Sequence, residues 1–239
     1  MNTEPTRRSL LQQSLIAGST LVAAAVIPEI LTGQPNDKAP EVTAIEDLMR
    51  EHGVIRRALV VYSECISRLR QTPGSVDPAA LQRTAQLLRS FGEEYHEKLL
   101  EEQHIFPVIR KMNGGLAHYA DILIAQHARG REITDYILAV TKGSKIAAQH
   151  AAPLAQAFEG FVRMYESHAA REDTIIFPAW KQNFTEKQLD ELSDQFEDIE
   201  HRVFGKDGFE DAEKTISSIE GSLGLADLSQ FTPPSPPKP

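Results

Sequence analysis

Apolar side chains recur at alternating steps of three and four residues along four long stretches of the chain. In the first stretch, about residues 42–71, these positions hold Ile45, Leu48, His52, Ile55, Leu59, Tyr62, Ile66 and Leu69. This spacing places the side chains on one face of an α-helix. Similar series predict further helices at about residues 77–112, 116–142 and 150–182.

Short turn sequences separate these stretches. "QTPGSVDP" follows the first, and its Asp77-Pro78 is typical of a helix start, while Asn113-Gly-Gly ends the second helix and "KGSK" precedes the fourth. Four helices with short connections predict an all-α, up-down-up-down four-helix bundle over residues 42–182. A fifth helix at about 185–203 and a last short one form an extension over 183–223, before a Pro-rich tail at 224–239.

Composition excludes several classes of function. The chain has 239 residues, of which 41% are hydrophobic, so it can bury a real core. Its formal net charge of −9 and its lack of a basic stripe argue against a nucleic-acid or anionic-membrane partner. Cys65 is the only cysteine, which excludes an intramolecular disulfide and a thiolate metal cage and predicts a core or interface thiol.

The N-terminal residues do not read as part of the bundle. "TRRSLLQ", with its two arginines, precedes a mildly apolar run from Leu15 to Ile27 and the small residues Ala23 to Ala25. Residues 1–31 therefore resemble a twin-arginine export signal, followed by a linker at 32–41. An uncleaved membrane anchor is the alternative, but the run is short for the about 20 residues of a membrane span. We expect a periplasmic or otherwise exported protein with no membrane segment in its mature form.

Polar residues interrupt the apolar faces at one level of the predicted bundle. Counting from the helix ends at about 1.5 Å per residue places six of them within about a turn of one another. They are His52, His96, Glu101, His127, His168 and Glu172. Buried unpaired carboxylates cost several kcal/mol, so this convergence predicts a metal site. Imidazole and carboxylate suit iron, manganese or zinc, and six ligands exceed the three or four of one zinc, which favours two bridged ions.

Two segments of similar sequence carry four of these residues. They read "YHEKLLEEQHIFPVIRK" from Tyr95 to Lys111 and "YESHAAREDTIIFPAWK" from Tyr165 to Lys181. With one histidine each in the first and third helices, the pattern over about residues 44–180 resembles the hemerythrin-like (HHE) cation-binding family. The resemblance implies a non-haem centre of two iron ions that binds molecular oxygen or a related small molecule. It also implies that the six residues are ligands, with Glu101 and Glu172 bridging the irons.

The sequence departs from the family pattern in two places. Glu101 stands five residues after His96, whereas Glu172 stands four after His168; a π-bulge near Leu99-Leu100 would realign the longer spacing, and Glu97 is the competing ligand. Arg131 stands four residues after His127, where oxygen carriers have a second histidine. One iron therefore lacks a nitrogen ligand unless Glu97, water or His201 replaces it. His104, His118 and His150 are expected at the surface.

The functional hypothesis is an exported diiron protein that binds oxygen or a similar small oxidant, with no protein partner indicated. The alternative is a diiron enzyme, either a ferroxidase or an oxidoreductase that consumes peroxide or nitric oxide. A ferritin-like oxidase fits less well because both Glu-x-x-His pairs, Glu93 with His96 and Glu101 with His104, lie on one helix, and Tyr165 stands where the fourth helix needs a glutamate. A third alternative is a purely structural bundle whose histidines pack in the core without metal. Metal analysis of the purified protein distinguishes it from the metal-binding hypotheses.

Overall fold

The computed structural model describes residues 42–112 and 114–237, so the predicted export signal at 1–31 and linker at 32–41 lie outside it. All regular elements of this described part are helices. In chain order they are α2 (Ala44–Gln71), η1 (Pro73–Ser75), α3 (Pro78–Leu87), η2 (Leu88–Ile105), α4 (Phe106–Ile109), α5 (Leu116–Val140), α6 (Ala148–Arg171), η3 (Glu172–Ile176), α7 (Phe177–Lys181), α8 (Glu186–Phe204), α9 (Gly208–Leu223) and η4 (Leu228–Phe231).

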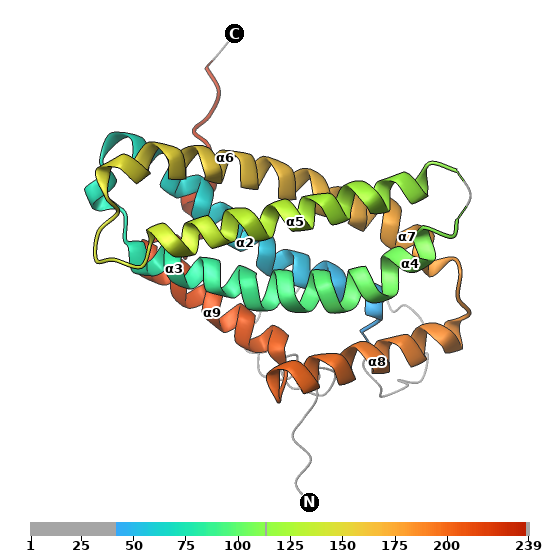
Figure 1. Ribbon diagram of the computed structural model, residues 1–239. Coiled ribbons are helices and arrows are strands. Elements are labelled where there is room, and N and C mark those ends of the chain that lie inside the picture. The colour runs from blue at the N-terminus through green and yellow to red at the C-terminus, as the bar shows by residue number, and fades with distance from the viewer. Residues whose placement is uncertain (1–41, 113, 238–239) are drawn as a thin grey trace, which may run out of the picture.

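The predicted four-helix bundle is confirmed. Its second member is the unbroken succession of α3, η2 and α4, and its fourth is the succession of α6, η3 and α7. Figure 1 shows α5, α6 and the α3–α4 run lying alongside one another, with α2 packed along α6 behind them. None of the helices among the described residues is both long and apolar enough to cross a membrane.

Local sequence explains where the first two bundle members begin. The Thr43 hydroxyl accepts a hydrogen bond from the backbone N–H of Glu46 at 3.2 Å and so caps α2. Asp77 accepts from the N–H of Ala79 at 2.9 Å, and Pro78, which lacks an N–H, takes the first helical position. The start that the sequence predicted at Asp77-Pro78 is therefore confirmed.

Aromatic side chains fill the end of the bundle beside α3. Tyr62 stacks on Phe158 at 4.2 Å between ring centroids, and Cys65 is buried beside them in the core, as predicted. The apolar spacing of residues 77–112 predicts that Leu99 faces inward, as Leu81 and Leu88 do, but Leu99 is only half-buried in the structure, whereas Leu100 is buried. The reason is that this stretch is a π-helix, whose wider turns rotate successive side chains away from their α-helical directions.

The C-terminal helices form a second layer across one side of the bundle, visible below it in Figure 1. α9 packs against α2 and α3 and has 16 residues, so it is longer than the short helix that the sequence predicted. Arg57 of α2 ties the layers together, because its guanidinium binds the carboxylates of Glu213 and Glu220. Gly205, with φ of 72°, ends α8 in the left-handed conformation that favours glycine.

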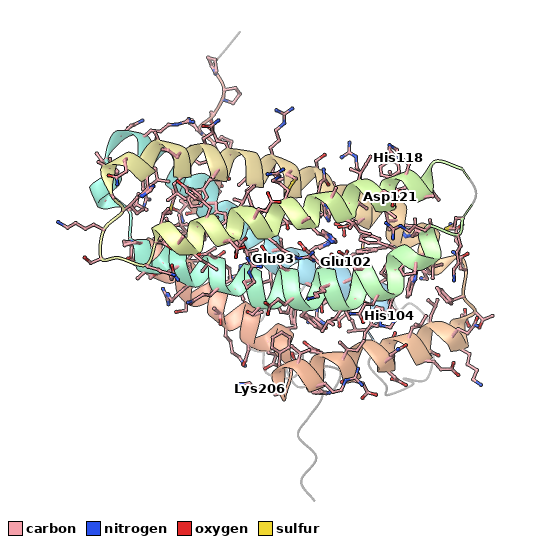
Figure 2. The ribbon with its side chains drawn as sticks, in the orientation of Figure 1. Glu93, Glu102, His104, His118, Asp121 and Lys206 are labelled. Atoms are coloured by element: carbon pink, nitrogen blue, oxygen red, sulfur yellow. The ribbon has the colours of Figure 1, made fainter. Side chains whose placement is uncertain are left out.

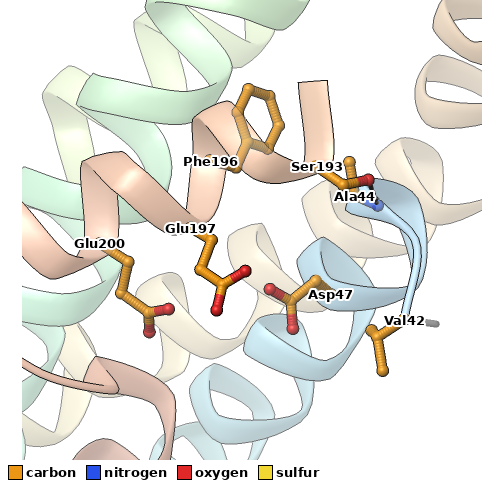
Figure 3. A pocket seen from close by; sticks show the side chains of 7 residues that line it. All are labelled: Val42, Ala44, Asp47, Ser193, Phe196, Glu197 and Glu200. Atoms are coloured by element: carbon orange, nitrogen blue, oxygen red, sulfur yellow. Dashed lines mark hydrogen bonds between the residues drawn. The ribbon is translucent and has the colours of Figure 1, made fainter. Parts of the chain in front are cut away.

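α8 also covers the start of α2, at the small pocket drawn in Figure 3. The backbone N–H of Ala44 donates to the Ser193 hydroxyl at 2.9 Å, which satisfies one of the free donors of the first helical turn. The carboxylates of Asp47, Glu197 and Glu200 line the same pocket. Negative charge near a helix N-terminus is favourable, so this junction stabilises the packing of α8 on the bundle.

Candidate metal centre

The six candidate ligands predicted from sequence meet in the middle of the bundle. α2 supplies one histidine, η2 a histidine and a glutamate, α5 one histidine, and the α6–η3 junction a histidine and a glutamate. None of the six is more than 3% exposed. They are His52, His96, Glu101, His127, His168 and Glu172.

The four histidines form two pairs. The rings of His52 and His96 are 4.7 Å apart between centroids, and those of His127 and His168 are 4.8 Å apart. The Nε2 atoms of His127 and His168 approach to 3.1 Å. Two imidazole nitrogens that bind one ion at right angles, each about 2.1 Å from it, lie about 3 Å from each other. The second pair therefore has the spacing of two ligands of one metal ion.

The two glutamates lie between the histidine pairs. Glu101 directs Oε1 toward His96 Nε2 and Oε2 toward His127 Nε2, each at 3.3 Å. Glu172 Oε2 lies 3.0 Å from His168 Nε2 and 3.5 Å from His52 Nε2. Each carboxylate thus reaches both pairs, which is the position of a ligand that bridges two ions.

The central polar atoms approach one another without forming hydrogen bonds. Both carboxylate oxygens of Glu101 and of Glu172, together with Nε2 of His96, are buried and make no hydrogen bond within the described residues. An uncompensated buried carboxylate costs several kcal/mol. The donor set of imidazole nitrogens and carboxylate oxygens therefore fits metal cations, which would compensate the buried charge and occupy these atoms.

Each of the four candidate histidines is oriented through its other ring nitrogen, Nδ1. The Nδ1 contacts are His52 with Asp173 at 2.7 Å, His96 with Glu51 at 2.6 Å, His127 with Glu102 at 3.0 Å and His168 with Gln126 at 2.9 Å. Such contacts fix the ring and leave Nε2 free to bind a metal. Sequence analysis missed these partners, although a signal exists: each stands directly beside a different candidate ligand in the chain.

Further groups hold these partners in place. Arg56 binds Asp173, Arg131 Nη2 donates to Glu102 Oε1 at 2.6 Å, and the Tyr95 hydroxyl donates to Glu51 Oε1 at 3.0 Å. The positive charges of Arg56 and Arg131 compensate carboxylates that would otherwise be costly this close to the core. The orientation of the histidines is therefore built into the protein rather than left to a bound ion.

The backbone at both glutamates is π-helical. The N–H of Phe106 bonds to the carbonyl of Glu101, and that of Phe177 bonds to the carbonyl of Glu172, each five residues back. The sequence predicted a bulge near Leu99-Leu100 only. The structure corrects its extent, because η2 spans 18 residues, and adds the unpredicted η3 of 5 residues.

Arg131 stands where oxygen carriers have a further histidine, and its side chain adds no metal ligand to the centre. Its guanidinium binds Glu102 and, at 3.2 Å, Glu97 Oε2, on the outer Nδ1 side of His127. Glu97 joins a group of potential metal ligands only with Glu102 and His127, and His201 belongs to no such group among the described residues.

Without a cation, the buried charges shift one another's proton affinities in opposite directions. Burial opposes protonation of His127, but Glu97, Glu101 and Glu102 outweigh it and raise the pKa to about 10. Burial, assisted by the neighbouring charge of His127, lowers the pKa of His168 to about 3. Burial and the neighbouring Glu101 raise the pKa of Glu172 well above its usual value. Burial opposes ionisation of Glu101, but His96 and His127 outweigh it and hold the pKa of Glu101 well below its usual value. The metal-free centre therefore favours ionisation of Glu101 and resists that of Glu172, whereas cations favour both.

A small cavity adjoins the centre. Its walls are His52, Ile55, His96, Glu97, Glu101, Tyr165, His168 and Ala169. About 10 Å³ is available to the centre of a water molecule, which is room for about one water. A ligand that reaches the centre from this side must therefore be very small.

The remaining histidines lie outside the centre. His118 is exposed on α5, as expected, and His150 is partly exposed (Figure 2 shows His118). His104, expected at the surface, is instead half-buried, with its ring 5.4 Å from that of Phe196 on α8, and burial lowers its pKa. The reason is that the C-terminal layer covers this side of η2.

Comparison with known proteins agrees with this geometry. The family model of the hemerythrin HHE cation binding domain matches residues 43–180. An uncharacterized protein of Mycobacterium bovis and two of Mycobacterium tuberculosis are each 43% identical over 235 residues, covering 95% of this chain and 91% of their own lengths. No solved structure matches the chain. The chain therefore belongs to the hemerythrin HHE family of cation-binding helical bundles.

Proposed function

We propose that the protein is an exported, non-haem diiron protein that binds oxygen or a related small oxidant at its buried centre. The observation that carries the proposal is the set of four buried carboxylate oxygens, from Glu101 and Glu172, that lie between two histidine pairs without a hydrogen bond. Two ions that share two bridging acids use all six side chains, whereas one zinc would leave two or three of them unused.

The residues of the chain have separate tasks in this proposal. His52 and His96 hold one ion, His127 and His168 hold the other, and the two glutamates join them. Two bound irons supply the redox chemistry that none of these side chains has by itself. The Phe177 ring lies 5.4 Å from that of His52 and the Phe106 ring lies 5.5 Å from that of His127, so buried aromatic rings exclude water from these two histidines.

A diiron enzyme remains the second candidate, and one observation favours it. Glu97 and Tyr165 form a buried, hydrogen-bonded pair in the wall of the cavity. A carrier needs only an apolar pocket for a diatomic ligand, whereas reduction of peroxide, oxygen or nitric oxide needs a supply of protons. Apart from the candidate metal ligands, Glu97 and Tyr165 are the polar side chains of the cavity wall, and the Tyr165 hydroxyl carries an exchangeable proton.

Turnover separates the carrier from the enzyme. The iron-loaded protein is exposed to one equivalent of oxygen or of hydrogen peroxide while its absorption spectrum is recorded. A carrier gives one stoichiometric and reversible change, and an enzyme continues to consume oxidant when reductant or Fe(II) is added. An iron-loaded protein whose spectrum responds to neither oxidant contradicts the proposal as a whole.

Export is a separate part of the proposal and rests on the sequence of residues 1–31. Twin-arginine transport carries folded proteins, which suits a chain that acquires its metal before it leaves the cytoplasm. Replacing Arg7 and Arg8 by lysine should retain the full-length protein in the cytoplasm, as measured by cell fractionation and immunoblotting. Unchanged export of that double variant contradicts this route.

A further inference from the structure

Tyr165 has an environment that the tasks assigned above do not explain. Its side chain is 4% exposed, its ring centroid lies 5.5 Å from that of His168, and it lines the small cavity beside the centre. Its hydroxyl donates to Glu97 Oε1 at 2.6 Å. A redox-competent phenol thus lies next to a candidate iron ligand, in contact with a group that can accept its proton.

The chain makes specific room for this hydroxyl. A Cβ atom at position 130 would lie 2.0 Å from the Tyr165 oxygen, so only glycine fits there. The acceptor is fixed as well, because Arg131 Nη2 holds the other oxygen of Glu97 at 3.2 Å. Gly130, Arg131 and Glu97 together determine where the phenolic O–H bond points.

Two other buried tyrosines lack this combination. Tyr62 is 0% exposed and lies two ring contacts away, through Phe161, but its hydroxyl makes no hydrogen bond within the described residues. Tyr95 donates to Glu51, whose other oxygen already binds His96 Nδ1, and it does not line the cavity. Tyr165 therefore differs from both in having a proton acceptor and contact with the ligand cavity at once.

We propose that Tyr165 donates one electron and one proton when the centre is oxidised. This inference rests on the proposed function and names an electron source for it. The oxidant is a small peroxide-class molecule, and each molecule accepts two electrons. A first equivalent takes both electrons from the two bound Fe(II) ions. A second equivalent takes one electron from the oxidised metal centre and one from Tyr165: the phenolic O–H bond breaks, and its proton passes along the hydrogen bond to the Glu97 carboxylate. The products are a neutral tyrosyl radical and a protonated Glu97.

The test uses the full-length protein loaded anaerobically with Fe(II). Two equivalents of hydrogen peroxide are added in succession, the sample is freeze-quenched, and its free-radical EPR signal is recorded beside iron content and the optical spectrum. The expected result is a tyrosyl signal that narrows when the protein contains ring-deuterated tyrosine. That signal should be lost in Tyr165→Phe and retained in the matched control Tyr62→Phe.

Two further variants separate the role of the O–H bond from general packing. Glu97→Gln removes the proton acceptor, and Gly130→Ala displaces the hydroxyl while keeping the tyrosine. Both should retain iron and lose most of the radical signal, provided that their melting temperatures confirm folding.

The outcomes distinguish the inference from the function on which it rests. A protein that takes up no iron, or whose iron does not react with peroxide, overturns the proposed function and the inference with it. Iron that reacts without any tyrosyl signal overturns the inference alone. A signal that survives in Tyr165→Phe, or that is lost only in Tyr95→Phe, also overturns the assignment to Tyr165.

Discussion

The two segments that carry the candidate bridging glutamates differ in sequence but share one backbone feature. Glu101 and Glu172 each stand five residues before the phenylalanine of a Phe-Pro pair. In both segments the N–H of that phenylalanine bonds to the carbonyl of the glutamate, which makes the turn π-helical. The spacing from histidine to glutamate, five residues in one segment and four in the other, does not decide whether the turn widens.

Proline supplies a physical reason for the shared feature. Pro107 and Pro178 have no N–H, so neither can bond to the carbonyl four residues earlier, and their rings crowd it. A wide turn immediately before the proline accommodates this loss. In the folded bundle, the same turn directs the glutamate side chain inward. We infer that the spacing from glutamate to proline causes the π-helical turn in both segments. The longer spacing from His96 to Glu101 is a separate feature of η2.

The segments differ in how far the widening extends. η3 has 5 residues, whereas η2 has 18 and reaches back past His96 to Leu88. A π-helix brings residues five apart onto one face, which is the spacing of His96 and Glu101. The longer run also keeps Glu93 and Glu97 buried next to the centre. Figure 2 shows Glu93 and Glu102 along the seam between η2 and α5.

The largest expected effect comes from removing a bridging acid. Glu101→Ala and Glu172→Ala should each lose one or both metal ions, because each carboxylate reaches both histidine pairs. Glu97→Ala should leave iron largely bound and change the spectrum or the affinity for small ligands. Metal analysis after anaerobic loading measures all three variants. If Glu97→Ala empties the site while Glu101→Ala keeps two irons, the assignment of the bridge in η2 is reversed.

The sequence allowed the bundle and the convergence of six polar residues to be predicted, because both follow from helical periodicity and distance along the axis. It did not allow the Nδ1 partners to be predicted. Asp173 and Glu51 read as ordinary polar neighbours of Glu172 and His52, and only tertiary packing shows that each contacts a histidine of another helix. The length of η2 was also beyond sequence reasoning, since no local signal marks where a π-helix begins.

Metal removal should have the next largest effect. Binding free energy adds to folding free energy, and a ligand at about 1,000 times its dissociation constant contributes about 4 kcal/mol. For a domain of this size that corresponds to a fall of roughly 10 °C in melting temperature on chelation. The Glu101→Ala variant is the control and should respond little to the chelator. An unchanged melting temperature after verified metal removal would mean that the histidines and glutamates compensate one another's buried charge without metal.

Glu93 is buried in η2, and η3 has no equivalent residue. Its carboxyl group should make the stability of the protein depend on pH. Burial raises its pKa from 4.5 to about 7, although Thr134 and Arg89 oppose the shift. A raised carboxyl pKa means that the folded state holds the proton more tightly, so stability falls as the pH rises between these values and stays lower above them. The difference corresponds to about 3 kcal/mol at most.

Glu93→Gln tests this dependence. The variant should be more stable than the wild type at about pH 8 and similar to it at about pH 4, in urea unfolding of the metal-loaded protein. Glu94→Gln, at the exposed neighbouring position, is the matched control and should show no such difference. A Glu93→Gln variant that is equally destabilised at both pH values contradicts a buried, protonated carboxyl.

The smallest effect should come from restoring a backbone donor at η3. Pro178→Ala returns an N–H that can bond to the carbonyl of Thr174, which favours an ordinary α-turn and rotates Glu172 away from the centre. We expect slower iron uptake or faster iron loss, with the fold retained. Pro153→Ala, within α6 and distant from the glutamate, is the control and should leave both rates unchanged. If both substitutions change the rates equally, the inference that the Glu-to-Pro spacing causes the π-helical turn is contradicted.

The number of iron ions bound per chain tests the central claim most directly. Purified metal-free protein is titrated anaerobically with Fe(II), and the bound metal is counted after removal of the excess. Two histidine pairs that share two bridging acids predict that uptake ends at two irons per chain, and that Glu101→Ala and Glu172→Ala fall short of this end point. A protein that holds a single zinc and takes up no iron under the same conditions contradicts the diiron account.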